Sequence, residues 1–111
     1  MKQIDLTRLT YHALIERKTR FELIEKTIGF GETICQVRDN QSPDCDIVLT
    51  STGVMGVIKD DNTVITAWVA NINQAIATYR TANGNKPMPE RLWNYINYNN
   101  NTTAWQKMAT A

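Results

Sequence analysis

The chain has 111 residues, 42% of them hydrophobic and 21% charged, and a formal net charge of +1. This length suits one domain with a single core, and the composition is that of a globular protein, which argues against wholesale disorder. The small net charge argues against a strongly basic nucleic-acid coat, and no apolar run reaches membrane-spanning length.

The N-terminal residues 1–29 are predicted to be helical. From Leu6 to Ile28, apolar residues recur at three- and four-residue spacing, which is typical of an amphipathic helix. A charged stretch near residues 18–19 separates two apolar groups, so one long helix and two shorter helices both fit. Gly29 and Gly31 are expected to end this segment.

Residues 32–69 are predicted to form a four-stranded antiparallel meander. Short β-type segments alternate with clusters of turn-forming residues, and their connections are too short for parallel crossovers. In the last strand, alternation places Val64 and Thr66 on the same face. The predicted strands cover residues 32–38, 47–50, 53–59 and 63–69.

Residues 71–98 are predicted to form a pair of helices. The first follows Asn71 as its cap and stops at Gly84, and the second opens near Pro89. A tail covers residues 99–111 and holds a short helical pattern near 104–108, which gives two or three C-terminal helices. The predicted fold class is α+β, with residues 1–111 as one domain.

The cysteine and histidine content argues against a metal centre. One histidine and two cysteines ten residues apart, Cys35 and Cys45, do not make a zinc set, so we expect neither metal nor cofactor. Cys35 reads as a buried thiol, and the pattern leaves open a disulfide between the two cysteines. The first ten residues lack an apolar signal core, so the expected location is the cytoplasm.

His12 is the first candidate for chemistry. On a helix, Arg8, His12, Glu16 and Arg20 follow one another at four-residue spacing along one stripe. An imidazole among guanidinium groups suits phosphodiester cleavage, because the histidine exchanges a proton while the arginines neutralise phosphate charge. The alternative is a surface histidine that pairs with Glu16.

The late aromatic residues suggest a different kind of site. Trp93, Tyr95 and Tyr98 lie among asparagines on the last predicted helix. They fit either core packing or an exposed polar-aromatic recognition surface for a partner.

The order of elements adds a resemblance. A helix with YHALIERKTR, a β-turn-β unit and then DIVLTSTGVMGVIKDDNTVITAWV is similar to the nuclease-like domains grouped as the barnase–EndoU–colicin–RelE fold. Such domains include toxin tips and domains attached to phage head proteins. The resemblance covers about residues 10–70 and implies metal-independent RNA cleavage, with functional positions at His12, Arg17 and Thr66.

Two main hypotheses and a third follow from these patterns. The first is a ribonuclease-like domain of phage or toxin-system origin, with RNA as substrate and catalysis by His12, Arg17 and Thr66. Phosphate or substrate would then be bound by Lys18, Arg20 and Thr50. The second is a non-enzymatic phage or mobile-element accessory protein that binds a protein partner through Trp93, Tyr95 and Tyr98. The third is a homodimer formed through a sheet edge or the last helix.

Overall fold

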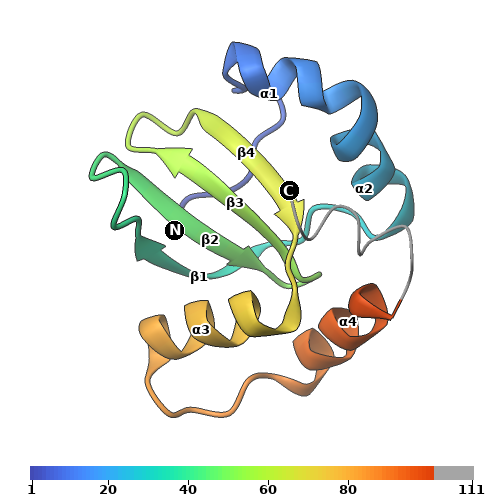
Figure 1. Cartoon of the computed structure of the whole chain (residues 1–111), viewed down its shortest axis with the longest axis vertical. Helices are drawn as coiled ribbons and strands as arrows, with labels where there is room; N and C mark the ends of the chain where they lie inside the picture. The colour runs from blue at the N-terminus through green and yellow to red at the C-terminus, as the bar shows by residue number, and fades with distance from the viewer. Residues whose placement is uncertain (102–111) are drawn as a thin grey trace.

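A computed structural model gives the fold (Figure 1) and describes residues 1–101, apart from the side chains of residues 16–18. A four-stranded antiparallel sheet, in the order β1-β2-β3-β4, lies between two helical parts of the chain. This confirms the α+β class and the meander, whereas the predicted helix near 104–108 lies outside the described residues. The elements are α1 (Tyr11–Glu16), η1 (Arg17–Phe21), α2 (Glu22–Thr27), β1 (Thr33–Arg38), β2 (Cys45–Thr50), β3 (Val54–Lys59), β4 (Val64–Val69), α3 (Ile72–Asn83) and α4 (Glu90–Asn100).

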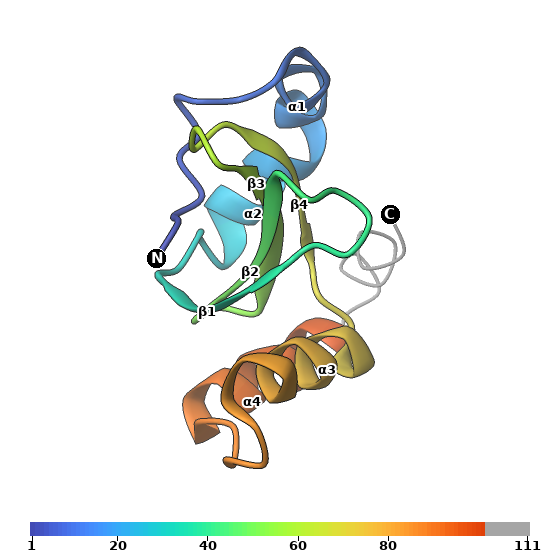
Figure 2. The same ribbon diagram turned by 90° about the vertical axis from the view of Figure 1, so that its left-hand side faces the viewer.

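The two faces of the sheet are covered by different parts of the chain (Figure 1 and Figure 2). Adjacent residues of β2 show this, because neighbouring side chains of a strand point to opposite faces. Val48 packs with Ile58 and Val64 beneath the N-terminal segment. Leu49 packs on the other face, in a cluster that includes Ala75 of α3 and residues Leu92 and Ile96 of α4.

The structure of the first ten residues differs from the prediction. They were expected to join the helix from Leu6, yet they run across the sheet and the helix begins only at Tyr11. Asp5 accepts hydrogen bonds from both the backbone and the hydroxyl of Thr7, a local arrangement that competes with a helical turn. Leu9 then forms a parallel bridge to Val64, so the segment extends the sheet instead of the helix.

The N-terminal helical part is interrupted near residues 18–19, so of the two predicted alternatives the structure has two short helices with a break. Between α1 and α2, η1 is one five-residue π-helical turn, Arg17–Phe21. Such a turn holds one more residue than an α-turn and shifts the face that follows it. Ala13 on one side of it, and Phe21 and Ile24 on the other, are consequently all buried in the same cluster.

The predicted C-terminal helical pair is present as α3 and α4. Asn71 caps α3, since its side chain accepts a hydrogen bond from the backbone N–H of Gln74 at 2.8 Å, and its own backbone N–H donates to the side-chain oxygen of Gln74. The helix stops at Gly84, which has a φ of +69°. Figure 2 shows α3 and α4 side by side at one end of the sheet.

Candidate functional site

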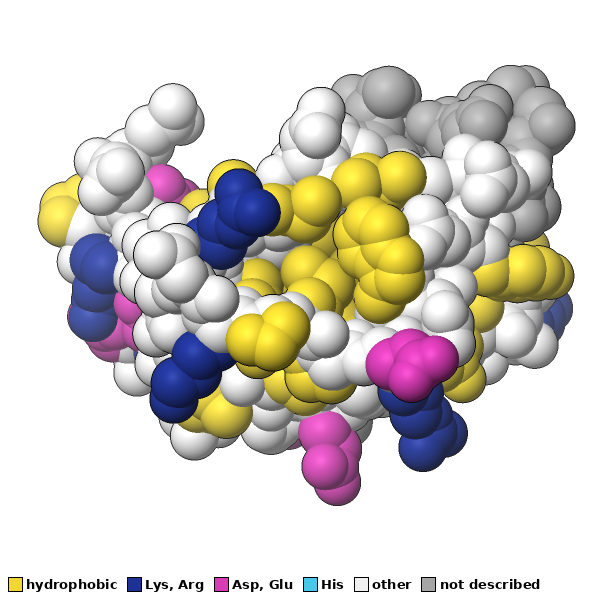
Figure 3. All heavy atoms as spheres, turned by 90° about the horizontal axis from the view of Figure 1, so that it is seen from below, with side chains coloured by type: hydrophobic (Ala, Val, Ile, Leu, Met, Phe, Trp, Pro, Cys, Tyr) yellow, Lys and Arg dark blue, Asp and Glu magenta, His cyan; other side chains and the backbone are white. Residues whose placement is uncertain are grey.

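An open groove lies between α3, the loop after it and the first turns of α4. Its volume is about 360 Å³. Figure 3 shows this side of the molecule, where hydrophobic side chains gather in a hollow with Lys or Arg side chains at its margin. The groove is lined by the apolar and aromatic side chains of Ile76, Tyr79, Met88 and Trp93 and by two cations, Arg80 and Lys86.

Helix spacing and one loop contact assemble the groove. Ile76, Tyr79 and Arg80 stand at i, i+3 and i+4 on α3, so their side chains share one face. The Tyr79 hydroxyl donates to the backbone carbonyl of Pro87 at 3.4 Å, which holds the loop against α3. Met88 then packs on the core cluster beneath, while Trp93 keeps 38% of its surface exposed.

The groove has a charge of one sign. Arg80 and Lys86 are both exposed, and no residue that lines the groove is an aspartate or glutamate. Within the described part of the chain, neither cation forms an ion pair. An apolar floor beside unpaired cations can hold a partner side chain that is apolar and has an anionic neighbour.

The predicted partner-binding residues do not form one surface. Trp93 lines the groove, whereas Tyr95 and Tyr98 line a separate hollow of about 260 Å³ with Arg91 and Asn94. The four residues of this second hollow stand at i, i+3, i+4 and i+7 and therefore occupy one stripe of α4. The helix thus presents aromatic side chains on two flanks.

A third, wider hollow lies on the open part of the sheet beside α3. It measures about 670 Å³, and its floor includes Val37, Ile47 and Val57. Its charged lining residues are of opposite sign, Arg38 and Asp39, and Arg38 is already engaged by carboxylates. Its one lining cation is therefore already paired, unlike the two cations of the groove.

His12 and Thr66 lie on opposite sides of the sheet. His12 is exposed on α1, which packs against β4 on the face that holds Ala13 and Ala67. Thr66 pairs with Val57, and both face the side of α3. The structure therefore does not bring these two predicted catalytic residues together, and the side chain of Arg17 is outside the described part.

A β-bulge explains where Thr66 points. The register between β3 and β4 shifts between Val57 and Ile58, so that Val57 pairs with Thr66 but Ile58 pairs with Val64. The extra residue, Ile65, breaks the simple alternation. Val64 and Thr66 consequently face opposite sides, and the expectation that they share a face is wrong.

The predicted phosphate-binding residues are occupied or not described. Thr50 is fully buried, and its hydroxyl accepts a hydrogen bond from the backbone N–H of Val54 at 3.2 Å. Arg20 donates to the carbonyl of Ala67 at 3.3 Å and so covers the outer edge of β4. Thr50 thus serves the β2–β3 turn, and the side chain of Lys18 falls outside the described residues.

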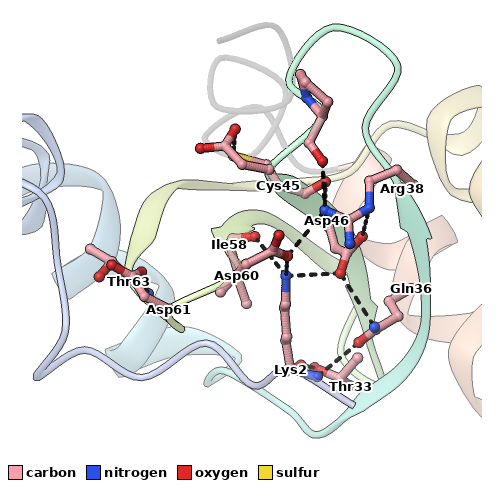
Figure 4. A network of polar contacts seen from close by, with 12 residues as sticks. Lys2, Thr33, Gln36, Arg38, Cys45, Asp46, Ile58, Asp60, Asp61 and Thr63 are labelled. Atoms are coloured by element: carbon pink, nitrogen blue, oxygen red, sulfur yellow. Dashed lines mark hydrogen bonds and ion pairs between the residues drawn. The ribbon is translucent and has the colours of Figure 1, made fainter.

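A charged network of four side chains ties the N-terminal segment to the sheet (Figure 4). Lys2 Nζ lies 2.8 Å from Asp46 on β2 and 2.8 Å from Asp60 after β3. Arg38 Nε lies 3.2 Å from Asp46 on the other side. The backbone N–H of Lys2 donates to Gln36, and its carbonyl accepts from the Thr33 hydroxyl.

The pKa shifts in this network are those of mutual pairing. Hydrogen bonds from Lys2 and then Arg38 lower the pKa of Asp60 below 3.8. Burial acts to lower the pKa of Lys2, but its hydrogen bonds to Asp46 and Asp60 outweigh that effect and raise it above 10.5. Lys2 and Asp60 thus each favour the charged form of the other, and this pairing stabilises the fold.

The cysteines are free and shielded. Burial raises the pKa of Cys35 to about 11. Burial, followed by the charge of Asp44, raises the pKa of Cys45. Because thiolates are the reactive form, neither thiol is suited to nucleophilic attack at neutral pH. Among the described residues no cluster of histidine, cysteine and acidic side chains could hold a metal ion.

Sequence reasoning found one wall of the groove and missed the other. Trp93 was singled out, but no site role was predicted for Ile76, Tyr79, Met88, Arg80 or Lys86. A usable signal was Arg80, a cation that follows Ile76 by one helical turn and precedes the end of the helix at Gly84. Which side chains Arg80 would face depends on the path of the loop between α3 and α4. Local residue spacing does not determine that path.

Comparison with known proteins adds no family to these observations. No family model, no curated protein and no solved structure matches the chain. Within residues 1–101, no helix has the length and apolar character needed to cross a membrane. The candidate site therefore rests on the geometry of the α3–α4 groove.

Proposed function

We propose that the protein is a non-enzymatic interaction module that binds an apolar segment of a protein partner in the α3–α4 groove. The observation that carries the proposal is an indole, Trp93, left 38% exposed beside Met88 and Tyr79 in a hollow with unpaired cations. Tryptophan, tyrosine and arginine are the residues that most often dominate binding energy at protein interfaces. Methionine adapts to partners of different shape.

The size and form of the groove favour a protein partner over a small ligand. At about 360 Å³ it lies at the lower end of small-molecule pockets, which bury most of their ligand. On this side of the molecule, hydrophobic side chains lie open on the surface (Figure 3). The groove suits one or two anchoring side chains of a larger molecule, with the flanking surface supplying further contact.

Selection from a displayed random peptide library on the folded protein tests the proposal. Peptides that are enriched should bind Trp93→Ala about 30-fold more weakly, the effect of losing a central aromatic contact of about 2 kcal/mol. The matched control is Tyr98→Ala, which removes an aromatic side chain from the other hollow of α4. Circular dichroism confirms that each variant is folded.

Two outcomes would contradict the proposal that the α3–α4 groove is the binding site. One is a selection that enriches no peptide. The other is a set of peptides that bind Trp93→Ala as well as the wild type, or that lose affinity only for Tyr98→Ala. The second result would move the interface to the opposite flank of α4.

Metal-independent RNA cleavage is the second candidate function. It is supported by an exposed imidazole, His12, on a helix that packs against β4. The placement of Thr66 on the other face means that a catalytic partner for His12 would have to come from elsewhere. The two candidates separate in one assay, which is given in the Discussion.

A further inference from the structure

We infer that the segment bound in the α3–α4 groove is acidic: an apolar anchor side chain beside one or two carboxylates of a protein partner. This inference rests on the proposed function and adds the chemistry of the partner. Its basis is the juxtaposition of Trp93 and Met88 with Arg80 and Lys86 in one hollow.

The two cations are available to a partner. Arg80 lies in the last turn of α3 and Lys86 two residues beyond Gly84, and both are exposed. Neither has an ion-pair partner in the described part of the chain. Elsewhere in the molecule Lys2 and Arg38 are neutralised by Asp46 and Asp60, so the groove cations differ from those that hold the fold.

The position of the nearest acid along α4 suggests an orientation for the partner. Glu90 opens α4 one turn before Trp93 and is not part of the groove lining. A carboxylate of the partner would therefore be favoured at the Arg80 and Lys86 side and disfavoured toward Glu90. The anchor side chain would lie against Trp93.

The positive charge of the groove is too local to bind a nucleic-acid strand. Phosphate-backbone binding draws on a run of several cations, whereas this groove has two and the whole chain has a net charge of +1. Two cations beside an apolar floor match the alternation of carboxylate and apolar side chains in an acidic amphipathic peptide. Such complementarity acts on specificity and on the association rate.

The experiment uses fluorescein-labelled versions of the enriched peptides and fluorescence anisotropy with the full chain. We expect the enriched set to be net acidic, and Glu→Gln or Asp→Asn versions to bind about tenfold more weakly, as for two partly exposed charge pairs. The double variant Arg80→Glu, Lys86→Glu should lose affinity for the acidic peptide and gain it for a version with Lys in place of its acids. The control Arg91→Glu changes the same charge on α4 outside the groove and should alter affinity less than twofold.

The outcomes separate the two proposals. If Trp93→Ala abolishes binding while neutral and acidic peptides bind equally, the groove is an interaction site and the acidic inference is overturned. If Trp93→Ala has no effect, the proposed function fails as well. A second copy of this chain is the remaining possible occupant of the groove, and analytical sedimentation of the protein alone tests it. If the protein is a dimer and the double variant Arg80→Glu, Lys86→Glu dissociates it, the partner is a second copy and the inference is overturned.

Discussion

Asp46→Asn should destabilise the protein through a specific loss of charge. The Asp46 side chain is 8% exposed and lies between Lys2 Nζ at 2.8 Å and Arg38 Nε at 3.2 Å. Asparagine keeps the size of the side chain but removes its charge. Its amide also presents one donor group, so one of the two cations would face a donor in place of an acceptor.

The expected size of this loss depends on the carboxylate that the two cations retain. Removing one partner of a buried ion pair costs about 3–5 kcal/mol, because the other charge stays buried without compensation. Here Lys2 retains Asp60 at 2.8 Å and Arg38 retains Asp60 at 3.0 Å. We therefore expect a smaller loss, about 2–3 kcal/mol in the free energy of unfolding.

Urea unfolding followed by far-ultraviolet circular dichroism measures this loss, with Asp60→Asn as the matched control. The Asp60 side chain is 56% exposed, so water compensates for much of its removal. Asp46→Asn should thus lower the stability distinctly more than Asp60→Asn does, without changing the slope of the unfolding free energy with urea. Equal losses for the two variants would refute the reasoning that burial of Asp46 makes its charge matter.

Four further predictions test other parts of the molecule. Asn71→Ala should lower the free energy of unfolding by about 1 kcal/mol because it removes the α3 cap, whereas the exposed Asn73→Ala should have little effect in the same urea titration. Gly56→Val should cost about 1–3 kcal/mol in that titration, since a Cβ at this position meets an isoleucine of the N-terminal segment at 3.0 Å. The lowered pKa of Asp60 means that its stabilisation is present above pH 3.8 and is lost as the pH falls through its folded pKa, so Asp60→Asn should flatten the acid limb of a stability–pH curve. Total RNA incubated with EDTA should remain equally intact with wild-type and His12→Ala protein; cleavage by the wild type that His12→Ala abolishes would favour the ribonuclease.

Local patterns were sufficient for much of the fold. The short β-type segments separated by turn residues predicted all four strands, because the connections leave only an antiparallel meander. The spacing of apolar residues on α3, with Asn71 before it and Gly84 after it, predicted that helix and its cap. These features depend on contacts within a few residues, which a sequence pattern records.

Other features depend on contacts between distant parts of the chain. Leu6 and Leu9 have helical spacing, yet the N-terminal segment is not helical, because Leu9 pairs with β4 and Lys2 binds Asp46. These long-range contacts outweigh a weak local preference for helix. The candidate site depends on them even more strongly. The bulge at Ile65 turns Thr66 away from the face of His12.

For the groove, the sequence by itself determined the helical spacing that assigns aromatic and cationic side chains to faces of α3 and α4. Only the tertiary structure decided that Trp93 and Arg80 face the same hollow, while Tyr95 and Tyr98 face another. The physical reason is that the path of the loop between α3 and α4, held by the bond from Tyr79 to Pro87, sets how the two helices meet. Helical periodicity assigns each side chain to a face of its own helix, and packing alone determines which faces come together.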